Sequence, residues 1–331
     1  MSNLFLKILN MSISASWLVL AVIVLRFALK RAPRWVTVLL WAIVAVRLVC
    51  PFSFESVLSL IPSAQTVSPD IMMDPTPQIT TGIEALNNAV NPIISQSFAP
   101  EPSASANPLQ ILIPMVSVIW LVGFSAMLIY TAGSYWLLRR KVRTAVVYKE
   151  NIFQSEYVDS PFVLGLFFPR IYLPFNMATQ DMGHVIAHEN AHIRRKDHWW
   201  KPLGFLLLTL HWFNPLMWFA YILLCRDIEL ACDEMVIKEL GCDQRADYTQ
   251  ALLSCSINRK SIAACPLAFG EVGVKERVKS VMKYKKPAFW IIVAAIAICA
   301  VVAVCFLTDP VQDDPNEPHS GEVTQIGRAH V

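Results

Sequence analysis

Long apolar stretches alternate with shorter polar ones along this chain, and four of the apolar stretches are long enough to cross a membrane. They cover residues 8–29, 35–50, 109–137 and 288–307. A bilayer core about 30 Å thick is crossed by a helix of about 20 predominantly apolar residues. We therefore predict four transmembrane helices, two of them within residues 1–50 and the others within residues 109–138 and 288–307.

A fifth apolar stretch, residues 201–226, is interrupted in its middle by His211 and by Asn214-Pro215. Proline ends or kinks a helix, so the stretch divides into two arms of about eleven residues, each about 16 Å long at 1.5 Å per residue. Arms of this length are too short to cross a bilayer. We predict a re-entrant hairpin that enters and leaves the membrane on the same side.

Basic residues are concentrated on one predicted side of the membrane. Residues 51–108 contain no Lys or Arg, whereas basic clusters occur at residues 26–34, 139–143 and 275–286. By the positive-inside rule these clusters are cytoplasmic. The N-terminus, a loosely ordered loop over 51–108 and a tail over 308–331 are then outside, and a domain over 139–287 is inside. A full crossing by the fifth stretch would move the last basic cluster outside, which favours the hairpin.

The composition supports a membrane protein, because 55% of the 331 residues are hydrophobic and 16% are charged. We expect membrane lipid as one partner. The net charge of +3 is too small to indicate direct binding of nucleic acid. The eight cysteines contain no C-x-x-C pair, so we expect reduced packing residues rather than a disulfide framework or a thiolate metal site.

The candidate chemistry lies in the segment GHVIAHENAHIRRKDHWW, which holds four of the seven histidines. Residues four apart share one face of a helix, so His188 and His192 point to one position. Together with Glu189 they form the H-E-x-x-H pattern, in which two histidines bind zinc and the glutamate acts as general base. His184 shares the face, but about 12 Å of helix separates it from His192. We expect it beside the ligands or in packing.

A catalytic zinc needs a third protein ligand and keeps one position for water. Downstream, CRDIELACDEMVIKEL has a helical pattern in which Glu229 and Asp233 share one face. We predict Glu229 as the third ligand and Asp233 as the acceptor for a ligand histidine. The other acids, Asp227, Glu234 and Glu239, are expected on the solvated face of an ordinary helix.

The segments HENAHIRRKDHWWK, HWFNPLMW and RDIELACDE resemble the membrane metallopeptidase family of the beta-lactam sensor-transducers BlaR and MecR. RLVCPFSFESVLSL, SPFVLGLFFPRIYLP and PLAFGEVGVKERVKSVMKYKKP are also similar to that family, so the resemblance covers nearly all of residues 1–307. It implies an α-helical multi-pass protein of the bacterial plasma membrane, with four transmembrane helices and a re-entrant hairpin. The cytoplasmic domain would be a gluzincin-like α+β zinc metallopeptidase.

The resemblance also implies roles for individual residues. The Zn²⁺ ligands would be His188, His192 and Glu229, with Glu189 as general base. The stretch Ile171, Tyr172 and Leu173 would form an edge strand against which an extended substrate pairs; the alternative is a plain core strand. Relatives are cut near residues 266–274, which makes Ala268-Phe269 a candidate self-cleavage bond.

The implied function is zinc-dependent hydrolysis of a peptide bond in a cytoplasmic regulator, such as a winged-helix repressor, and in the protein itself, as a step of transmembrane signalling. A homodimer is compatible with this function. One alternative is a non-catalytic receptor or scaffold stabilised by zinc, against which Glu189 argues, because structural zinc sites take four protein ligands and need no base. The other is a housekeeping prenyl-protein-type membrane peptidase, which the basic-free outer loop and the PLAFGE segment fit less well.

The tail over 308–331 is short and acidic, too short for a penicillin-binding domain. Its last six residues, IGRAHV at 326–331, are what a sequencing adapter followed by a stop codon encodes. We therefore expect the natural reading frame to continue beyond Gln325 and an outer domain to be missing from this sequence.

Overall fold

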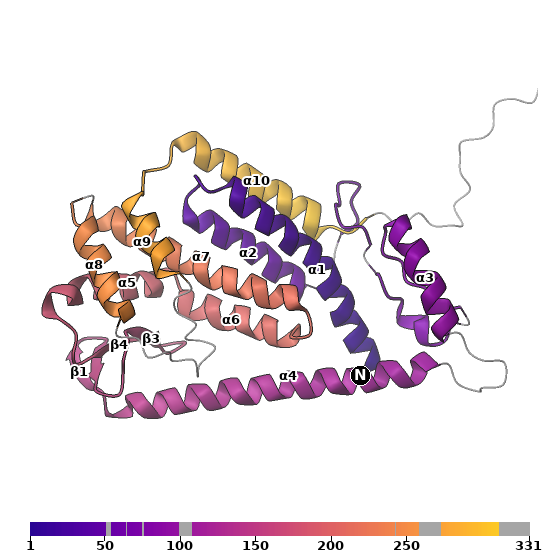
Figure 1. The fold of residues 1–331 in the computed structure, drawn as a ribbon, viewed down its shortest axis with the longest axis horizontal. Coiled ribbons are helices and arrows are strands. Elements are labelled where there is room, and N and C mark those ends of the chain that lie inside the picture. Colours follow the sequence, from indigo (N-terminus) through magenta and orange to yellow (C-terminus); the bar gives the residue numbers. More distant parts are fainter. Residues whose placement is uncertain are drawn as a thin grey trace, which may run out of the picture.

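The computed structural model describes residues 1–50, 54–63, 65–74, 76–98, 108–241, 243–257 and 273–310, and it is mostly helical (Figure 1). A helical bundle occupies the middle of the molecule, a small sheet lies at one end, and α3 (Glu84–Phe98) lies at the other. The bundle comprises α1 (Ser2–Ala28), α2 (Arg34–Val49), α4 (Pro108–Lys141), α6 (Asp197–Leu210), α7 (Pro215–Leu240) and α10 (Phe289–Leu307). Beside the sheet lie α5 (Thr179–Arg194), α8 (Arg245–Ile257) and α9 (Val274–Met282), and two short 3₁₀ helices are η1 (Pro69–Met72) and η2 (Val142–Thr144).

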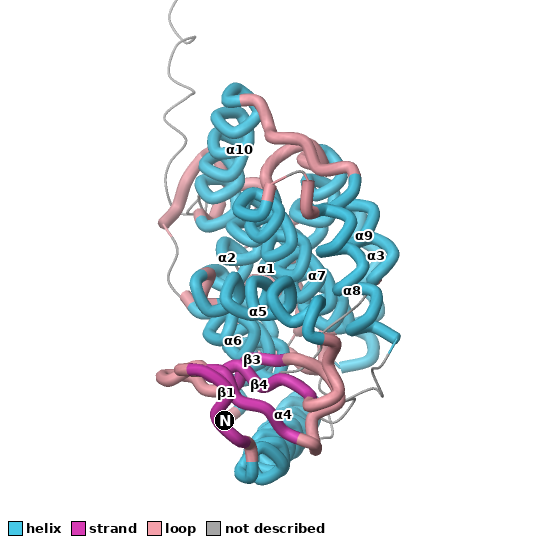
Figure 2. Tube along the Cα trace, turned by 90° about the vertical axis from the view of Figure 1, so that its left-hand side faces the viewer, coloured by secondary structure: helices cyan, strands magenta, loops and turns pink. Residues whose placement is uncertain are grey.

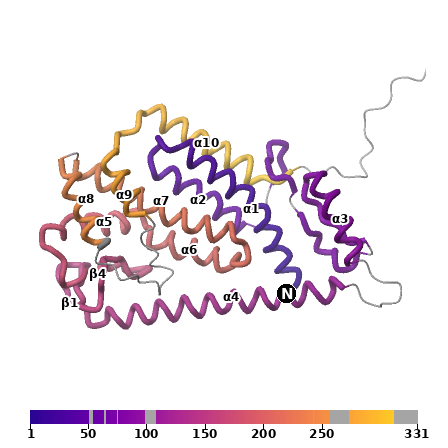
Figure 3. Tube along the Cα trace, viewed as in Figure 1, coloured from indigo at the N-terminus to yellow at the C-terminus, as the bar shows by residue number. Residues whose placement is uncertain are grey.

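Among the described residues, three helices are long and apolar enough to cross a membrane: α1, α4 with η2, and α10. The second predicted span corresponds to α2, which has 16 residues and is therefore about 24 Å long at 1.5 Å per residue. This helix packs against α1, α7 and α10. Figure 3 shows α1 and α2 between α10 and α7, although α10 follows them by more than two hundred residues in the chain. Four spans therefore remain a prediction, with α2 the shortest of them.

The fifth apolar stretch folds as a helical hairpin, in which α6 leads away from the sheet end and α7 returns. At its tip, Asn214 accepts a hydrogen bond from the backbone N–H of Leu216 and caps α7, and Pro215 occupies the first turn, where its missing N–H costs nothing. The Asn214 side chain also donates to the hydroxyls of Ser12 and Ser16 on α1, both at 2.9 Å. Ten residues of α1 precede Ser12, so the tip lies part way along that helix.

The return of α7 is fixed at the sheet end by Asp227. Its carboxylate accepts two hydrogen bonds from Arg26 of α1, at 2.6 and 2.7 Å, and one from the Trp41 indole of α2, at 2.8 Å. The expectation of a solvated Asp227 was therefore wrong, since the residue is 0% exposed. This face of α7 packs on α1 and α2 instead of facing water. Glu239, by contrast, is exposed and pairs with Arg194.

A four-stranded sheet precedes α5 in the chain. Its strands are β1 (Val146–Lys149), β2 (Ile152–Ser155), β3 (Phe162–Leu164) and β4 (Arg170–Pro174), in the order β1-β2-β4-β3. β4 pairs in parallel with β2 and antiparallel with β3. Figure 2 shows the sheet near α5 at the end of the molecule.

The structure corrects the prediction of an edge strand at Ile171, Tyr172 and Leu173. These residues belong to β4, which is hydrogen-bonded on both sides, so its backbone groups are already used. Ile171 and Leu173 are fully buried and pack with Val185 of α5. The alternative of a core strand is the correct one, and the edge strand next to it is β3.

The basic clusters gather at the sheet end of the bundle. Arg26 contacts Asp227 there, Arg26 to Arg34 lead into α2, and the last turn of α4 leads into β1. Glu55 bridges to Asp309, which follows the end of α10, and that end of α10 lies toward α3 (Figure 1). The basic clusters at one end of the bundle agree with the prediction that they lie on one side of the membrane. Which side is the cytoplasm remains a prediction.

We expect Asp227→Ala to destabilise the protein by about 3–5 kcal/mol, because it removes a fully buried carboxylate and leaves the half-buried Arg26 guanidinium without its partner. Unfolding the detergent-solubilised protein with heat or denaturant measures the loss of stability. The matched control is Glu239→Ala, which breaks an exposed ion pair and should cost less than about 1 kcal/mol. Equal effects of the two substitutions would contradict the anchoring role of Asp227.

Candidate metal centre

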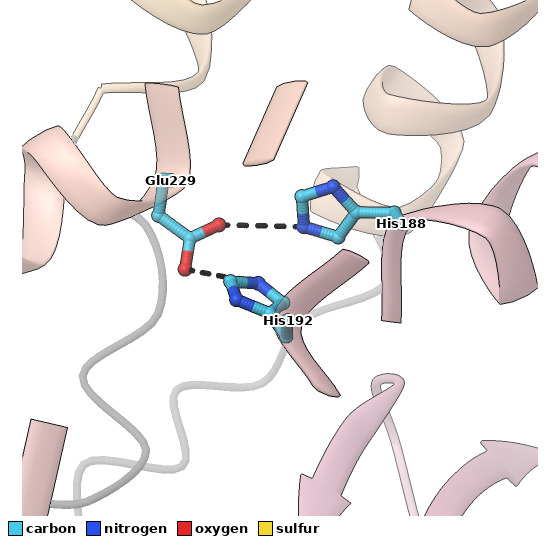
Figure 4. Close-up of side chains that lie close together, drawn as sticks. All are labelled: His188, His192 and Glu229. Atoms are coloured by element: carbon cyan, nitrogen blue, oxygen red, sulfur yellow. Dashed lines mark ion pairs between the residues drawn. The ribbon is translucent and has the colours of Figure 1, made fainter. Parts of the chain in front are cut away.

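Three side chains from two helices converge beside the sheet. His188 and His192 lie one turn apart on α5, and Glu229 faces them from α7 (Figure 4). The Nε2 of His188 is 3.4 Å from Oε2 of Glu229, and the Nε2 of His192 is 3.5 Å from Oε1. All three residues are buried, and one ligand atom from each lies within 4.8 Å of the others.

These separations fit a tetrahedral zinc ion. Ligand atoms 2.0–2.2 Å from a tetrahedral metal are about 3.3–3.6 Å apart. Each histidine nitrogen lies at such a distance from one oxygen of the Glu229 carboxylate, His188 from Oε2 and His192 from Oε1. The donor set of two imidazoles and one carboxylate is also the set that catalytic zinc uses. The Nδ1 atoms of both histidines are engaged by other side chains, and their Nε2 atoms face Glu229. The Nε2 of His188 also lies 3.3 Å from the Arg277 guanidinium.

His188 is held from behind by a buried polar group. Its Nδ1 is 2.9 Å from the Tyr248 hydroxyl of α8 and 3.3 Å from Oδ1 of Asp233. Tyr248 donates its own hydrogen bond to Asp233, at 2.7 Å. Arg277 of α9 donates to both carboxylate oxygens of Asp233, each at 2.8 Å. Four elements, α5, α7, α8 and α9, therefore fix the orientation of this imidazole.

His192 has a separate support at the start of α6. Its Nδ1 is 2.9 Å from Oδ2 of Asp197, and the Cys232 thiol donates to the same oxygen at 3.2 Å. These three residues also form a close group of possible metal ligands. Contacts of 2.9 to 3.2 Å are hydrogen-bond lengths, so this group positions His192.

Two cations neutralise Glu229. Lys201 of α6 lies 2.8 Å from Oε1, and Arg277 lies 3.3 Å from Oε2. Sequence reasoning missed Asp197, Lys201, Tyr248 and Arg277 as members of this site. Asp197 and Lys201 are four residues apart in HENAHIRRKDHWWK, the segment that also holds His188 and His192, and this spacing was a usable signal. Tyr248 and Arg277 reach the site only through the packing of α8 and α9.

The charges around the histidines favour their protonated forms when no metal is bound. Burial lowers the pKa of His188, but hydrogen bonds to Asp233 and Glu229 outweigh burial and raise it to about 9. Burial likewise lowers the pKa of His192, and the charge of Glu229 outweighs it, so that the net shift is upward. Burial raises the pKa of Glu229, yet Lys201 and His192 hold it well below its usual range.

A small cavity adjoins the three predicted ligands. It is lined in part by His184, His188, Glu189, Tyr248 and Arg277. Its volume of about 20 Å³ is enough for one water molecule. Glu189 therefore borders the same cavity as His188. A general base has to lie beside the water that it activates, and Glu189 is in that position.

Within the described part of the chain, His184 is not a member of the ligand group. Its ring packs edge-on against that of Tyr248, with 6.3 Å between the ring centroids. His184 therefore lies next to the group that supports His188. The candidate self-cleavage residues Ala268 and Phe269 fall outside the described residues, as does the tail from 311 onward.

Comparison with known proteins gives one family. A family model described as BlaR1 peptidase M56 matches residues 6–281, which is most of the chain. A relative, the regulatory protein BlaR1 of Bacillus licheniformis, is 28% identical over 139 residues, which make up 40% of this chain and 23% of that relative. The matched part is thus under a quarter of the relative's length.

We expect zinc affinity to rise with pH between 6.5 and 7.5, by about tenfold or more. Zinc binds neutral imidazole, and below a pKa of about 9 His188 carries a proton that has to leave on binding. Each proton released changes the apparent affinity about tenfold per pH unit. Chelator competition at the two pH values measures the slope. Glu239→Gln, a substitution at an exposed residue of α7, should leave this slope unchanged, and a pH-independent affinity would contradict the proton assignment.

Proposed function

Because the chain belongs to the BlaR1 peptidase M56 family, we propose that it is a membrane-embedded zinc endopeptidase that acts in transmembrane signalling. The observation that carries the proposal is the convergence of His188, His192 and Glu229 at zinc-like separations beside a cavity bordered by Glu189. Among the described residues the donor group has three members. Three protein ligands leave a position for water, as in catalytic zinc sites, whereas structural sites take four.

Zinc, when held by the two histidines and Glu229, supplies Lewis acidity for polarising a peptide carbonyl. Glu189 takes a proton from the water whose oxygen attacks the carbonyl carbon, and it then delivers that proton to the amine nitrogen as the peptide bond breaks. Asp233 and Asp197 hold the Nδ1 atoms, which keeps both Nε2 atoms directed at the metal position. Lys201 and Arg277 keep Glu229 ionised and compensate the buried acids.

For the substrate, we propose a cytoplasmic regulator of repressor type, together with the chain itself at Ala268-Phe269. The name of the relative, a regulatory protein, supports a signalling role. An extended substrate would pair with β3, because β3 is the sheet edge that packs on α5 and Pro161 before it lines the cavity. The peptidase domain would face the cytoplasm of a bacterial cell, with the N-terminus outside.

The test compares wild type with Glu189→Gln for zinc content and for fragments cut between residues 266 and 274. We expect the substituted protein to retain about one zinc and to lose cleavage by at least about a hundredfold, since only the proton acceptor is removed. Glu229→Gln should lower both zinc content and cleavage, because it removes a ligand.

The matched control is Glu239→Gln, an exposed glutamate on the same helix as Glu229, which should keep zinc and cleavage. Cleavage by Glu189→Gln at the wild-type rate would overturn the catalytic assignment. Wild-type protein without zinc would overturn the metal assignment.

A further inference from the structure

A second and larger cavity lies away from the metal centre, as an apolar groove between α2 and α6. Its volume is about 270 Å³. Three small residues, Ala42, Ala45 and Gly204, leave this space between the two helices, and Leu224 of α7 contributes to its lining. The groove is not closed: Trp35 and Trp200 on its rim are 38% and 40% exposed.

The two ends of the groove differ in charge. On α2 its lining runs from Trp35 to Ala45, ten residues and therefore about 15 Å along the helix axis. Trp35 directly follows Arg34, the last residue of the first basic cluster. Arg195 also lines the groove, and α6 begins two residues after it. One end of the groove is therefore cationic, at the sheet end of the bundle, and the remainder is apolar.

These dimensions match one lipid of a single leaflet. A length of about 15 Å is half of a bilayer core about 30 Å thick, which is the depth that one acyl chain occupies. Exposed tryptophans at the cationic end are typical of the membrane-water boundary. With α2 and α6 in the membrane, as the sequence predicts for the second span and the hairpin, the groove opens toward acyl chains. An apolar groove in that position is filled by lipid or by another helix.

Arg195 is the charged side chain in the lining of the groove. In the part of the chain that the structure describes, its guanidinium contacts Asp197 through Nε, at 3.3 Å. The two terminal nitrogens of a guanidinium form a planar fork that fits a phosphate. Asp197 is also the residue that contacts Nδ1 of His192. The Asp197 side chain therefore lies between Arg195 of the groove and a predicted zinc ligand.

We propose that the groove between α2 and α6 is a binding site for one anionic phospholipid of the cytoplasmic leaflet, with an acyl chain between the helices and the phosphate on Arg195. The inference goes beyond peptidase activity and does not require zinc. Neutral phospholipid should bind more weakly, because an attractive interaction of about 1 kcal/mol per basic residue near the headgroups corresponds to about fivefold in affinity.

The test is native mass spectrometry of the full chain in detergent, offered equal amounts of phosphatidylglycerol and phosphatidylcholine with identical acyl chains. We expect wild type to retain one phosphatidylglycerol in about fivefold preference. Arg195→Gln should abolish the preference while keeping weak retention. Ala42→Leu, which fills the groove, should lose both lipids, and Ala45→Leu provides a second filling variant should the first fail to fold.

Two matched controls are available. Arg194→Gln removes the neighbouring arginine, which pairs with Glu239 at the surface, and Ala126→Leu adds the same bulk at an exposed position of α4. Both should retain lipid as wild type does. The proposal is overturned if the folded filling variants keep the lipid, if wild type retains both lipids equally, if inorganic phosphate alone displaces the lipid, or if wild type is a lipid-free dimer.

Discussion

Glu229 can meet His188 and His192 only because α7 returns to the end of the bundle from which α6 departs. The hairpin turns at Asn214, where a capping amide and two serine hydroxyls of α1 satisfy the polar tip. The return is fixed by Asp227, which is bound to α1 and α2 at the sheet end. Glu229 is two residues further along the same helix, so the position of the third predicted ligand follows from the way α7 is anchored.

The metal centre is surrounded by a closed set of opposite charges. Two histidines, Lys201 and Arg277 face the carboxylates of Glu229, Asp233 and Asp197 within one buried region. Burying any one of these charges alone would be costly, and removing one leaves its partner uncompensated. Each imidazole is therefore oriented by residues that also depend on one another, which explains why α5, α6, α7 and α9 all contribute to a site of three ligands.

Much of the site could be predicted from the sequence, because it depends on helix periodicity. The spacing of His188 and His192, and of Glu229 and Asp233, follows from 3.6 residues per turn and needs no knowledge of the fold. Arg277 and Tyr248 could not be predicted in this way, since no local pattern shows which side chains α9 and α8 bring to the centre. The burial of Asp227 and the interior place of β4 depend on which neighbours pack beside them, and strand alternation does not distinguish an edge from a core strand.

The polar tip of the hairpin has a consequence for how the protein is made. Asn214 depends on Ser12 and Ser16 for its hydrogen bonds, and an amide without partners is expensive in a lipid environment. The hairpin is therefore not an independent insertion unit, because it needs α1 to be in place. Synthesis from the N-terminus provides this order, since α1 precedes the tip by about two hundred residues.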